Sequence, residues 1–396
     1  MKIAMAKTPA FENTEVAFRH KSTGELLKSR LLFQLMGNPK LVHWGGHITE
    51  TALRWKLPVS PLYRLTIYNQ FCGGESLEEC MHTVDLLAKS KLTTMLNYGV
   101  EFKETEEDFD AALDKNLEAI HFSKKNKNVK VLCVKPTGYG RLQLFEKMQS
   151  EKPLTKAEKK ELEKVKHRFH QISEAGQKAG IAIYFDAEES WIQDSLDQLV
   201  EEMMETFNQE EAVVFNTFQL YRHDRLAYLK AQGEKAKKSG YRLGAKIVRG
   251  AYMEKERLRA NEMNYPSPIH ARKDLVDIDF AAAMRYCLEN LPHIDVCIAS
   301  QSEESNYQAM TLMKELHIPA NSPQVTFSQL YGMGDHISYN MAELGYRVCK
   351  YLPFGPVKDV IPYLIRRAQE NTSVSGQVGR ELSLIQQEIE RRKTCR

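Results

Sequence analysis

Residues 180–219, GIAIYFDAEESWIQDSLDQLVEEMMETFNQEEAVVFNTFQ, contain one copy of the pattern that decides the fold. The stretch begins with the apolar run GIAIYFDAE, continues with helical periodicity over residues 191–204, and ends with a second apolar run, AVVFNTFQ. Both runs are almost continuously hydrophobic, which is typical of strands buried on both faces of a parallel sheet. The stretch therefore predicts a strand, a helix and a second strand.

The same alternation extends from about residue 92 toward the C-terminal end of the sequence. Strand and helix repeated eight times predict an α/β fold, a TIM-type (β/α)8 barrel, rather than an open doubly wound sheet. No GxGxxG follows a run, so a Rossmann domain has no support. The eight runs are LTTMLNYGVE, VKVLCVK, GIAIYFDAE, AVVFNTFQ, LGAKIVRGAY, IDVCIAS, SPQVTFSQL and YRVCKYLP.

We expect the chain to have three parts. Residues 1–91 are predicted to form a mostly helical accessory segment, residues 92–380 the barrel that holds the site, and residues 381–396 a helical tail. The basic end of the tail, RRKTCR, is expected to fray. Thr155 and Glu158 have the spacing of a capping box and predict the start of a helix.

Charge and cysteine content exclude several classes of protein. The chain has 55 basic and 52 acidic side chains among 396 residues, a near balance that gives no reason to expect a nucleic-acid partner. Its seven cysteines are scattered, odd in number and without a CxxC motif. This usage favours a reducing compartment and argues against a disulfide framework or a metal site.

The sequence favours a cytoplasmic protein. It has no run of about 18 apolar residues that would span a bilayer, and residues 1–20 resemble neither a signal peptide nor a transit peptide. Residues 26–44 mix Leu, Phe and Trp with Lys and Arg, a composition that also suits a helix lying on the inner face of the membrane. Packing against the main domain is the more favoured use of this segment.

A (β/α)8 barrel carries its function at the carboxyl ends of its strands, and polar residues gather there. Any one of them is most simply a solvated loop residue, but together they place several cations at one mouth, which suits an anionic substrate and an anionic cofactor. No GxSxG or HExxH motif indicates a nucleophile or a metal. The polar strand-end residues are Lys135, Asp186, Glu188, Gln219, Tyr221, Lys246, Arg249 and Tyr351, with the last expected to end the eighth strand.

Two adjacent arginines lie in a helical pattern near the end of the sequence. In YLPFGPVKDVIPYLIRRAQEN, residues 351–371, Tyr363, Arg366, Arg367 and Glu370 share one polar helical face. Taken alone, the helix favours a solvated face with an Arg–Glu pair at helical spacing.

The chain resembles the proline dehydrogenase family. The resemblance is carried by YLPFGP with YLIRRAQEN, GAKIVRGAY, YFDAEES, NTFQLY and FSQLYGMG over residues 92–375, and by FCGGES near residue 72. It implies a distorted (β/α)8 barrel with FAD at its mouth, L-proline stacked on the flavin, and a quinone as electron acceptor. The expected reaction is oxidation of proline to Δ1-pyrroline-5-carboxylate by hydride transfer, with a pyrroline-5-carboxylate dehydrogenase as a candidate to receive the product.

The resemblance also implies roles for individual residues. Arg366 and Arg367 match the arginine pair that grips the substrate carboxylate, with Lys135 nearby. Asp186 and Lys246 match catalytic positions, and Lys246 replaces the arginine usual in bacterial relatives. Tyr351 is expected to cover the proline ring, with Leu330 and Tyr363 completing the wall. The cofactor positions implied are Ala187, Gln219, Lys246, Val248, Arg249, Gly250, Ala251, Tyr252, Ser300, Gln301 and Glu370, where Ser300–Gln301 replaces a common Thr/Ser–His pair.

Three other functions stay open from the sequence. The first is oxidation of hydroxyproline, since hydroxyproline-specific relatives carry a smaller residue at the position of Tyr351. The second is a Schiff-base lyase that uses Lys135 or Lys246. The third is a non-catalytic, membrane-associated or regulatory barrel.

Overall fold

The computed structural model describes residues 11–38, 44, 55, 63–99, 104–361, 363–365 and 377–394. Among these residues, eight strands form a closed barrel in chain order, and each neighbouring pair from β2 to β7 is parallel. The predicted (β/α)8 barrel is therefore confirmed. The strands are β1 (Thr93–Tyr98), β2 (Val129–Val134), β3 (Ala182–Phe185), β4 (Val214–Gln219), β5 (Leu243–Val248), β6 (Ile294–Ala299), β7 (Val325–Leu330) and β8 (Val348–Phe354).

The chain forms two compact units, which we call the central unit and the terminal unit. The central unit comprises Met95–Tyr98 and Phe102–Ser328, and the terminal unit comprises Met1–Thr94, Gly99–Glu101 and Gln329–Arg396.

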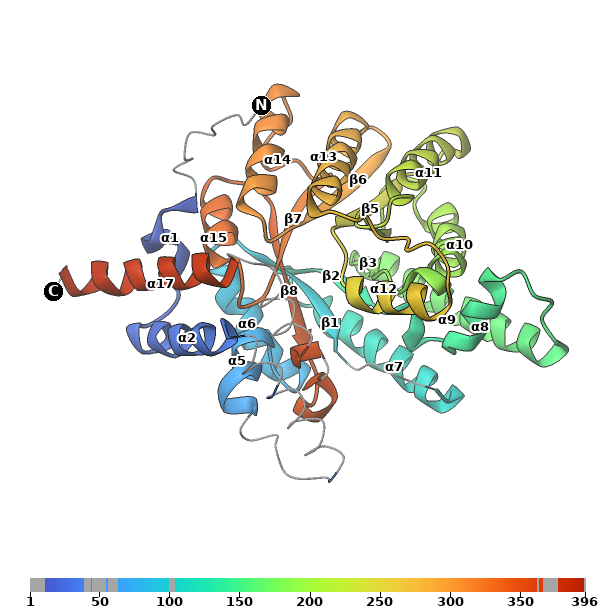
Figure 1. Ribbon diagram of the computed structural model, residues 1–396, viewed down its shortest axis with the longest axis horizontal. Helices are drawn as coiled ribbons and strands as arrows, with labels where there is room; N and C mark the ends of the chain where they lie inside the picture. Colours follow the sequence, from blue (N-terminus) through green and yellow to red (C-terminus); the bar gives the residue numbers. More distant parts are fainter. Residues whose placement is uncertain are drawn as a thin grey trace. The chain divides into compact units, whose positions relative to one another are not determined.

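Helices follow the strands of the central unit, as Figure 1 shows for β5 and β6. Every residue of β4 is buried, which agrees with the continuous hydrophobicity of its sequence. Thr155 and Glu158 form the predicted capping box. The helices of this unit are α7 (Glu106–Ser123), η3 (Pro136–Gly138), α8 (Leu142–Gln149), α9 (Lys156–Ala179), α10 (Ser190–Phe207), α11 (Arg225–Ser239), α12 (Met253–Glu262), α13 (Lys273–Glu289) and α14 (Glu303–Glu315).

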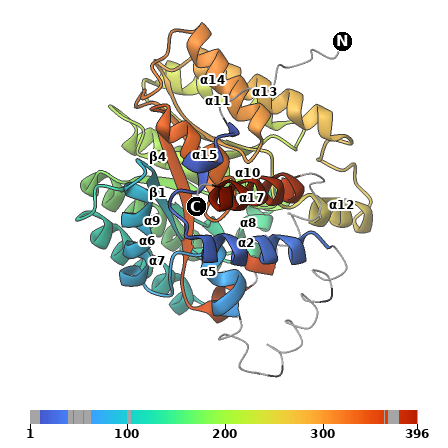
Figure 2. The same ribbon diagram turned by 90° about the vertical axis from the view of Figure 1, so that its left-hand side faces the viewer.

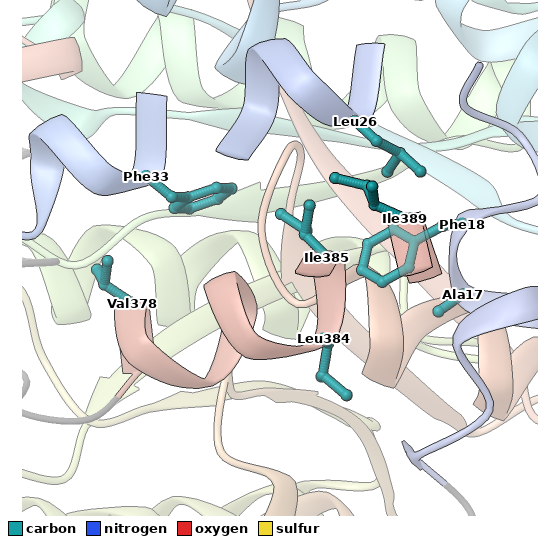
Figure 3. Packing of buried hydrophobic residues seen from close by; sticks show 8 residues of the cluster. All are labelled: Ala17, Phe18, Leu26, Phe33, Val378, Leu384, Ile385 and Ile389. Atoms are coloured by element: carbon teal, nitrogen blue, oxygen red, sulfur yellow. The ribbon is translucent and has the colours of Figure 1, made fainter. Parts of the chain in front are cut away.

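The terminal unit joins helices from both ends of the described chain. Figures 2 and 3 show α2 beside α17, with Leu26 and Phe33 of α2 facing Ile385 and Ile389 of α17 in a buried apolar cluster. Besides strands and the helical residues 357–361, the described part of this unit contains α1 (Thr14–Phe18), α2 (Thr23–Met36), η2 (Arg64–Tyr68), α5 (Asn69–Phe71), α6 (Leu77–Ala88), α15 (Asp335–Glu343) and α17 (Gln377–Thr394).

Helix α2 has two apolar faces. Its buried face packs in the cluster with α17 of the same unit, and packing of the whole segment 26–44 against the main domain stays a prediction. On the opposite side Leu27, Leu31 and Leu35 recur every fourth residue and are 42%, 58% and 50% exposed. Over the described part of the chain, every helix is too short or too polar to cross a membrane.

Two expectations about chain ends and strand ends were wrong. The basic end of the tail does not fray before Thr394, because Arg392 donates from Nη1 to the Lys21 carbonyl at 2.8 Å and from Nη2 to the Phe18 carbonyl at 2.9 Å. Strand β8 ends at Phe354 rather than at Tyr351. The chain stays extended past Tyr351 because the Pro353 carbonyl accepts a hydrogen bond from the Gly73 amide at 2.8 Å.

Candidate active site

A buried ion pair joins strand β5 to the end of strand β3. Lys246 Nζ lies 2.5 Å from Asp186 Oδ1, and the lysine side chain is 7% exposed. Burial by itself favours the neutral amine, but the Asp186 carboxylate holds the pKa of Lys246 above its usual value. The side chain of Lys246 is therefore a fixed cation at neutral pH.

Arg249 follows β5 directly and is fixed from three directions. Its Nε donates to Asp277 Oδ1 of α13 at 2.8 Å, Nη1 to Ser300 Oγ at 2.9 Å and Nη2 to Ser305 Oγ at 2.8 Å. The guanidinium also lies over the Phe280 ring, 4.5 Å from its centroid. The structure thus brings together Arg249 and Ser300, two residues that the sequence placed in the same site.

Hydrogen bonds of Glu188 connect residues at the carboxyl ends of four strands, β2 to β5. Its carboxylate accepts from Thr137 Oγ1 at 2.8 Å and from the Tyr252 hydroxyl at 3.3 Å, and its carbonyl accepts from Gln219 Nε2 at 2.7 Å. Gln219 Oε1 in turn accepts from the Ala251 amide at 3.2 Å. Two of the predicted cofactor positions, Gln219 and Ala251, are therefore directly bonded, and a third, Tyr252, is joined to them through Glu188.

Gly250 occupies a position that only glycine fits. Its φ is +141°, and a Cβ built there would lie 2.5 Å from the Tyr221 ring. The backbone of this turn therefore lies directly against an aromatic ring. The sequence predicted that the backbone at Gly250 and Ala251 could approach a ligand closely; the close contact at Gly250 is with the Tyr221 ring, so the approach to a ligand stays a prediction.

The remaining predicted residues of the central unit lie at strand ends. Ala187 is buried and follows Asp186, whereas Lys135 and Val248 are half-buried after β2 and at the end of β5. Gln301 follows Ser300, and its buried Oε1 has no hydrogen-bond partner among the described residues. An unsatisfied buried acceptor is costly, so Gln301 is suited to receive a donor from a bound molecule.

In the terminal unit, Leu330 ends β7 and Tyr351 lies within β8. The Tyr331 amide donates to the Tyr351 carbonyl at 2.9 Å, so the backbone after Leu330 is bonded to that of Tyr351. Tyr351 and Tyr363 are both buried, with 9% and 6% exposure. Arg366, Arg367 and Glu370 lie outside the described residues.

The sequence did not identify the partners that hold these residues. Asp277 lies within α13, and Thr137 follows β2 in a short 3-10 turn, so neither stands in a recognisable motif. The sequence marks Glu188 only as a polar residue at the end of a strand. Its partners Thr137 and Tyr252 are 51 and 64 positions away in sequence, and local patterns carry no signal for such contacts.

These features define a class of protein, a (β/α)8 barrel with fixed cations and tightly bonded backbone at the carboxyl ends of its strands. The described residues contain no cluster of three or more His, Cys, Asp or Glu side chains that could hold a metal ion. The family model for proline dehydrogenase matches residues 80–380. The chain therefore belongs to the proline dehydrogenase family.

The chain is also similar to individual proteins. The chain is 34% identical over 322 residues to the carbapenem antibiotics biosynthesis protein CarD of Pectobacterium carotovorum, covering 81% of this chain and 83% of CarD. It is 30% identical over 426 residues to the mitochondrial proline dehydrogenase 1 of Dictyostelium discoideum, covering 96% of this chain and 74% of that protein.

Solved structures agree on the fold. The crystal structure of proline utilization A from Bdellovibrio bacteriovorus, inactivated by N-propargylglycine, superimposes with a TM-score of 0.72 at 21% identity. The match covers 95% of this chain and 40% of that one, so the present chain spans less than half of the larger protein.

Proposed function

We propose that the protein is an FAD-dependent dehydrogenase that oxidises L-proline to Δ1-pyrroline-5-carboxylate. The observation that carries the proposal is the buried Lys246–Asp186 pair, with its 2.5 Å contact, in the same unit as the fixed Arg249 and the Gly250 turn. A permanent cation held in a buried place suits a redox cofactor on which negative charge develops. Membership of the proline dehydrogenase family supports the substrate.

The residues present fit FAD. Lys246 and Arg249 supply positive charge for an anionic dinucleotide, Gly250 forms the turn directly after Arg249, and Gln301 offers a buried acceptor that needs a donor. We assign the cofactor to these residues together with Ala187, Gln219, Val248, Ala251, Tyr252, Ser300 and Glu370. Bound FAD would supply the oxidant, accepting a hydride from the ring carbon beside the proline nitrogen and then passing the electrons to a quinone.

The side chains of the protein bind and orient the substrate. We assign the proline carboxylate to Arg366, Arg367 and Lys135, because planar guanidinium groups match a carboxylate with parallel hydrogen bonds. Tyr351, with Leu330 and Tyr363, would pack over the ring and exclude water. Lys246 keeps its proton throughout, since Asp186 raises its pKa, so it acts as a fixed charge and not as a proton donor.

An anaerobic titration tests this function. The purified protein should show a flavin absorption spectrum that L-proline bleaches, and a long-chain quinone in anionic vesicles should restore it. Vesicles are used because the exposed leucines of α2 form an apolar stripe beside Lys28, which suits a lipid surface. A colourless protein would contradict the cofactor, and a flavin untouched by proline would contradict the substrate. Restoration that is equally fast without vesicles would contradict the membrane contact.

Hydroxyproline is the alternative substrate, and Tyr351 decides between the two. Replacing Tyr351 by serine should lower kcat/KM for proline and raise the relative efficiency with 4-hydroxyproline, because the serine leaves space for the added hydroxyl. A pocket that only crowds a hydroxyl discriminates by about tenfold to a few hundredfold, which sets the size of the change. The measurement is the ratio of kcat/KM for the two substrates. An unchanged ratio at full FAD content would remove Tyr351 from the substrate pocket.

A further inference from the structure

A buried lysine holds the turn between β7 and α15, residues 330–334. Lys350 of β8 is 0% exposed, and its Nζ donates to the Met333 carbonyl at 2.6 Å and to the Leu330 carbonyl at 3.3 Å. The same atom lies 2.9 Å from Asp335 Oδ1, at the start of α15. An ammonium group has three N–H donors, and these are its three acceptors. Lys350 therefore fixes the turn near both of its ends.

The N-terminal segment completes this arrangement. Lys21, between α1 and α2, lies 2.9 Å from the second oxygen of Asp335, so the buried carboxylate is shared by two lysines. Burial alone would favour the protonated acid, but Lys21 and Lys350 hold the pKa of Asp335 well below its usual range. His20 Nε2 lies 3.7 Å from the same carboxylate, and burial lowers the pKa of this histidine to about 3, so His20 is neutral.

Two further contacts hold the turn. Gln70 Nε2 donates to the Gly332 carbonyl at 2.8 Å, and the Gly334 amide donates to Glu381 of α17. Gly332 has a φ of +77°, and a Cβ there would lie 1.9 Å from the Gln70 carbonyl oxygen. Segments from both ends of the described chain thus meet at this turn.

The turn is bonded to a residue assigned to the substrate. The Tyr331 amide donates to the Tyr351 carbonyl at 2.9 Å. Lys350 and Tyr351 are successive residues of β8, so their side chains point to opposite faces of the strand. Lys350 therefore supports the strand from the face opposite to that of the Tyr351 ring, and a shift of the turn displaces Tyr351.

We propose that Lys21 is a positioning residue for the substrate, which acts through Asp335 and Lys350 to fix Leu330 and Tyr351. The inference rests on the proposed function, because that function assigns Leu330 and Tyr351 to the proline pocket. Residues that contact a substrate need supporting side chains whose own positions are fixed by hydrogen bonds. Loss of Lys21 leaves Asp335 Oδ2 without its lysine, so the carboxylate, Lys350 and the turn gain freedom.

The test compares Lys21→Met with Arg19→Met. Arg19 belongs to the same N-terminal segment and pairs with Glu343 at the far end of the same helix α15, at 2.5 Å. It therefore controls for loss of a tether between these two segments. Lys21→Met should lower kcat/KM for proline about tenfold, mainly through KM, whereas Arg19→Met should change it less than twofold. Lys21→Arg should restore most of the loss, because it keeps the charge.

A second arm distinguishes positioning from general destabilisation. If Lys21 acts through Tyr351, its replacement in a Tyr351→Ser background should cost at most about threefold, because coupled residues are not additive. Hydrogen exchange of the Tyr331 amide should accelerate in Lys21→Met but not in Arg19→Met. A full tenfold loss of kcat/KM in the Tyr351→Ser background would overturn the inference. Equal kinetics together with equal hydrogen exchange in Lys21→Met and Arg19→Met would also overturn it.

Failure of the proposed function and failure of the inference about Lys21 give different results. A wild-type protein that does not oxidise proline overturns the proposed function, and exchange at the Tyr331 amide then decides alone whether Lys21 holds the turn. If Lys21→Met does not fold, Gln70→Met replaces it. This variant loses the hydrogen bonds that Gln70 makes with the Gly332 carbonyl and with Ser29 Oγ, keeps the ion pairs, and should reproduce the rise in KM and the faster exchange.

Discussion

Replacing Lys246 by methionine is expected to remove most of the activity and to destabilise the protein. The substitution leaves Asp186 without the lysine that lies 2.5 Å from it in a buried place. Breaking such a pair on one side costs about 3–5 kcal/mol of folding free energy. Loss of a fixed charge beside a reacting centre lowers kcat by about 100-fold to 1000-fold. Urea unfolding and steady-state kinetics measure the two effects separately.

Lys246→Arg is the matched control, because it keeps the charge. Its kcat/KM should remain within about tenfold of the wild-type value. If Lys246→Met retains the activity of Lys246→Arg at full FAD content, the charge of Lys246 has no part in the reaction.

Asp186→Asn tests the same pair through pH. In the wild-type protein Asp186 raises the pKa of Lys246, so the amine stays protonated to at least about pH 10. Without the carboxylate, burial lowers this pKa, and the proton is lost as pH rises. The variant should therefore lose kcat/KM at alkaline pH where the wild type does not. Identical alkaline limits would show that Asp186 does not control the charge of Lys246.

The barrel could be predicted because its signal is local and repeated. Each strand of a closed parallel barrel is buried on both faces, so runs such as that of β4 are continuously apolar. Helix α12 was missed because only Glu256 and Ala260 of its ten residues are buried, which leaves no apolar stripe in the sequence. The end of β8 was misplaced because its extension past Tyr351 depends on a hydrogen bond from Gly73, far away in the chain.

The candidate site could be predicted only as a list of strand-end residues. The barrel topology brings carboxyl ends of strands to one end, so Asp186, Gln219 and Arg249 were expected to gather. The bonds that fix them could not be predicted, because Glu188 and Asp277 lie in unremarkable sequence and their partners are distant. Lys350 reads as one residue of an apolar strand, and only the structure reveals its contacts with Asp335 and the turn.

The arginine pair carries the largest expected effect on substrate binding. Arg366→Met and Arg367→Met should each lower kcat/KM for proline by about tenfold or more, because a hydrogen bond to a charged group contributes about 1.5–3 kcal/mol. Both variants should keep their FAD and their folding. The motive is the family motif YLIRRAQEN, in which two planar guanidinium groups are available for one carboxylate.

Pyrrolidine, which is proline without its carboxylate, separates binding of that group from any other role of the arginines. Arg366→Met and Arg367→Met should lose activity toward proline but not toward pyrrolidine. The value of kcat/KM for proline divided by that for pyrrolidine should therefore fall toward one. Lys358→Met is the control, since Lys358 is an exposed cation in the preceding helical residues 357–361. Even an ion pair between exposed helix residues contributes only about 0.3–0.5 kcal/mol to stability, so this variant should fold normally and leave kcat/KM for both substrates unchanged. If Arg366→Met and Arg367→Met behave like Lys358→Met, the arginines belong to the solvated helix face that the sequence pattern alone favoured.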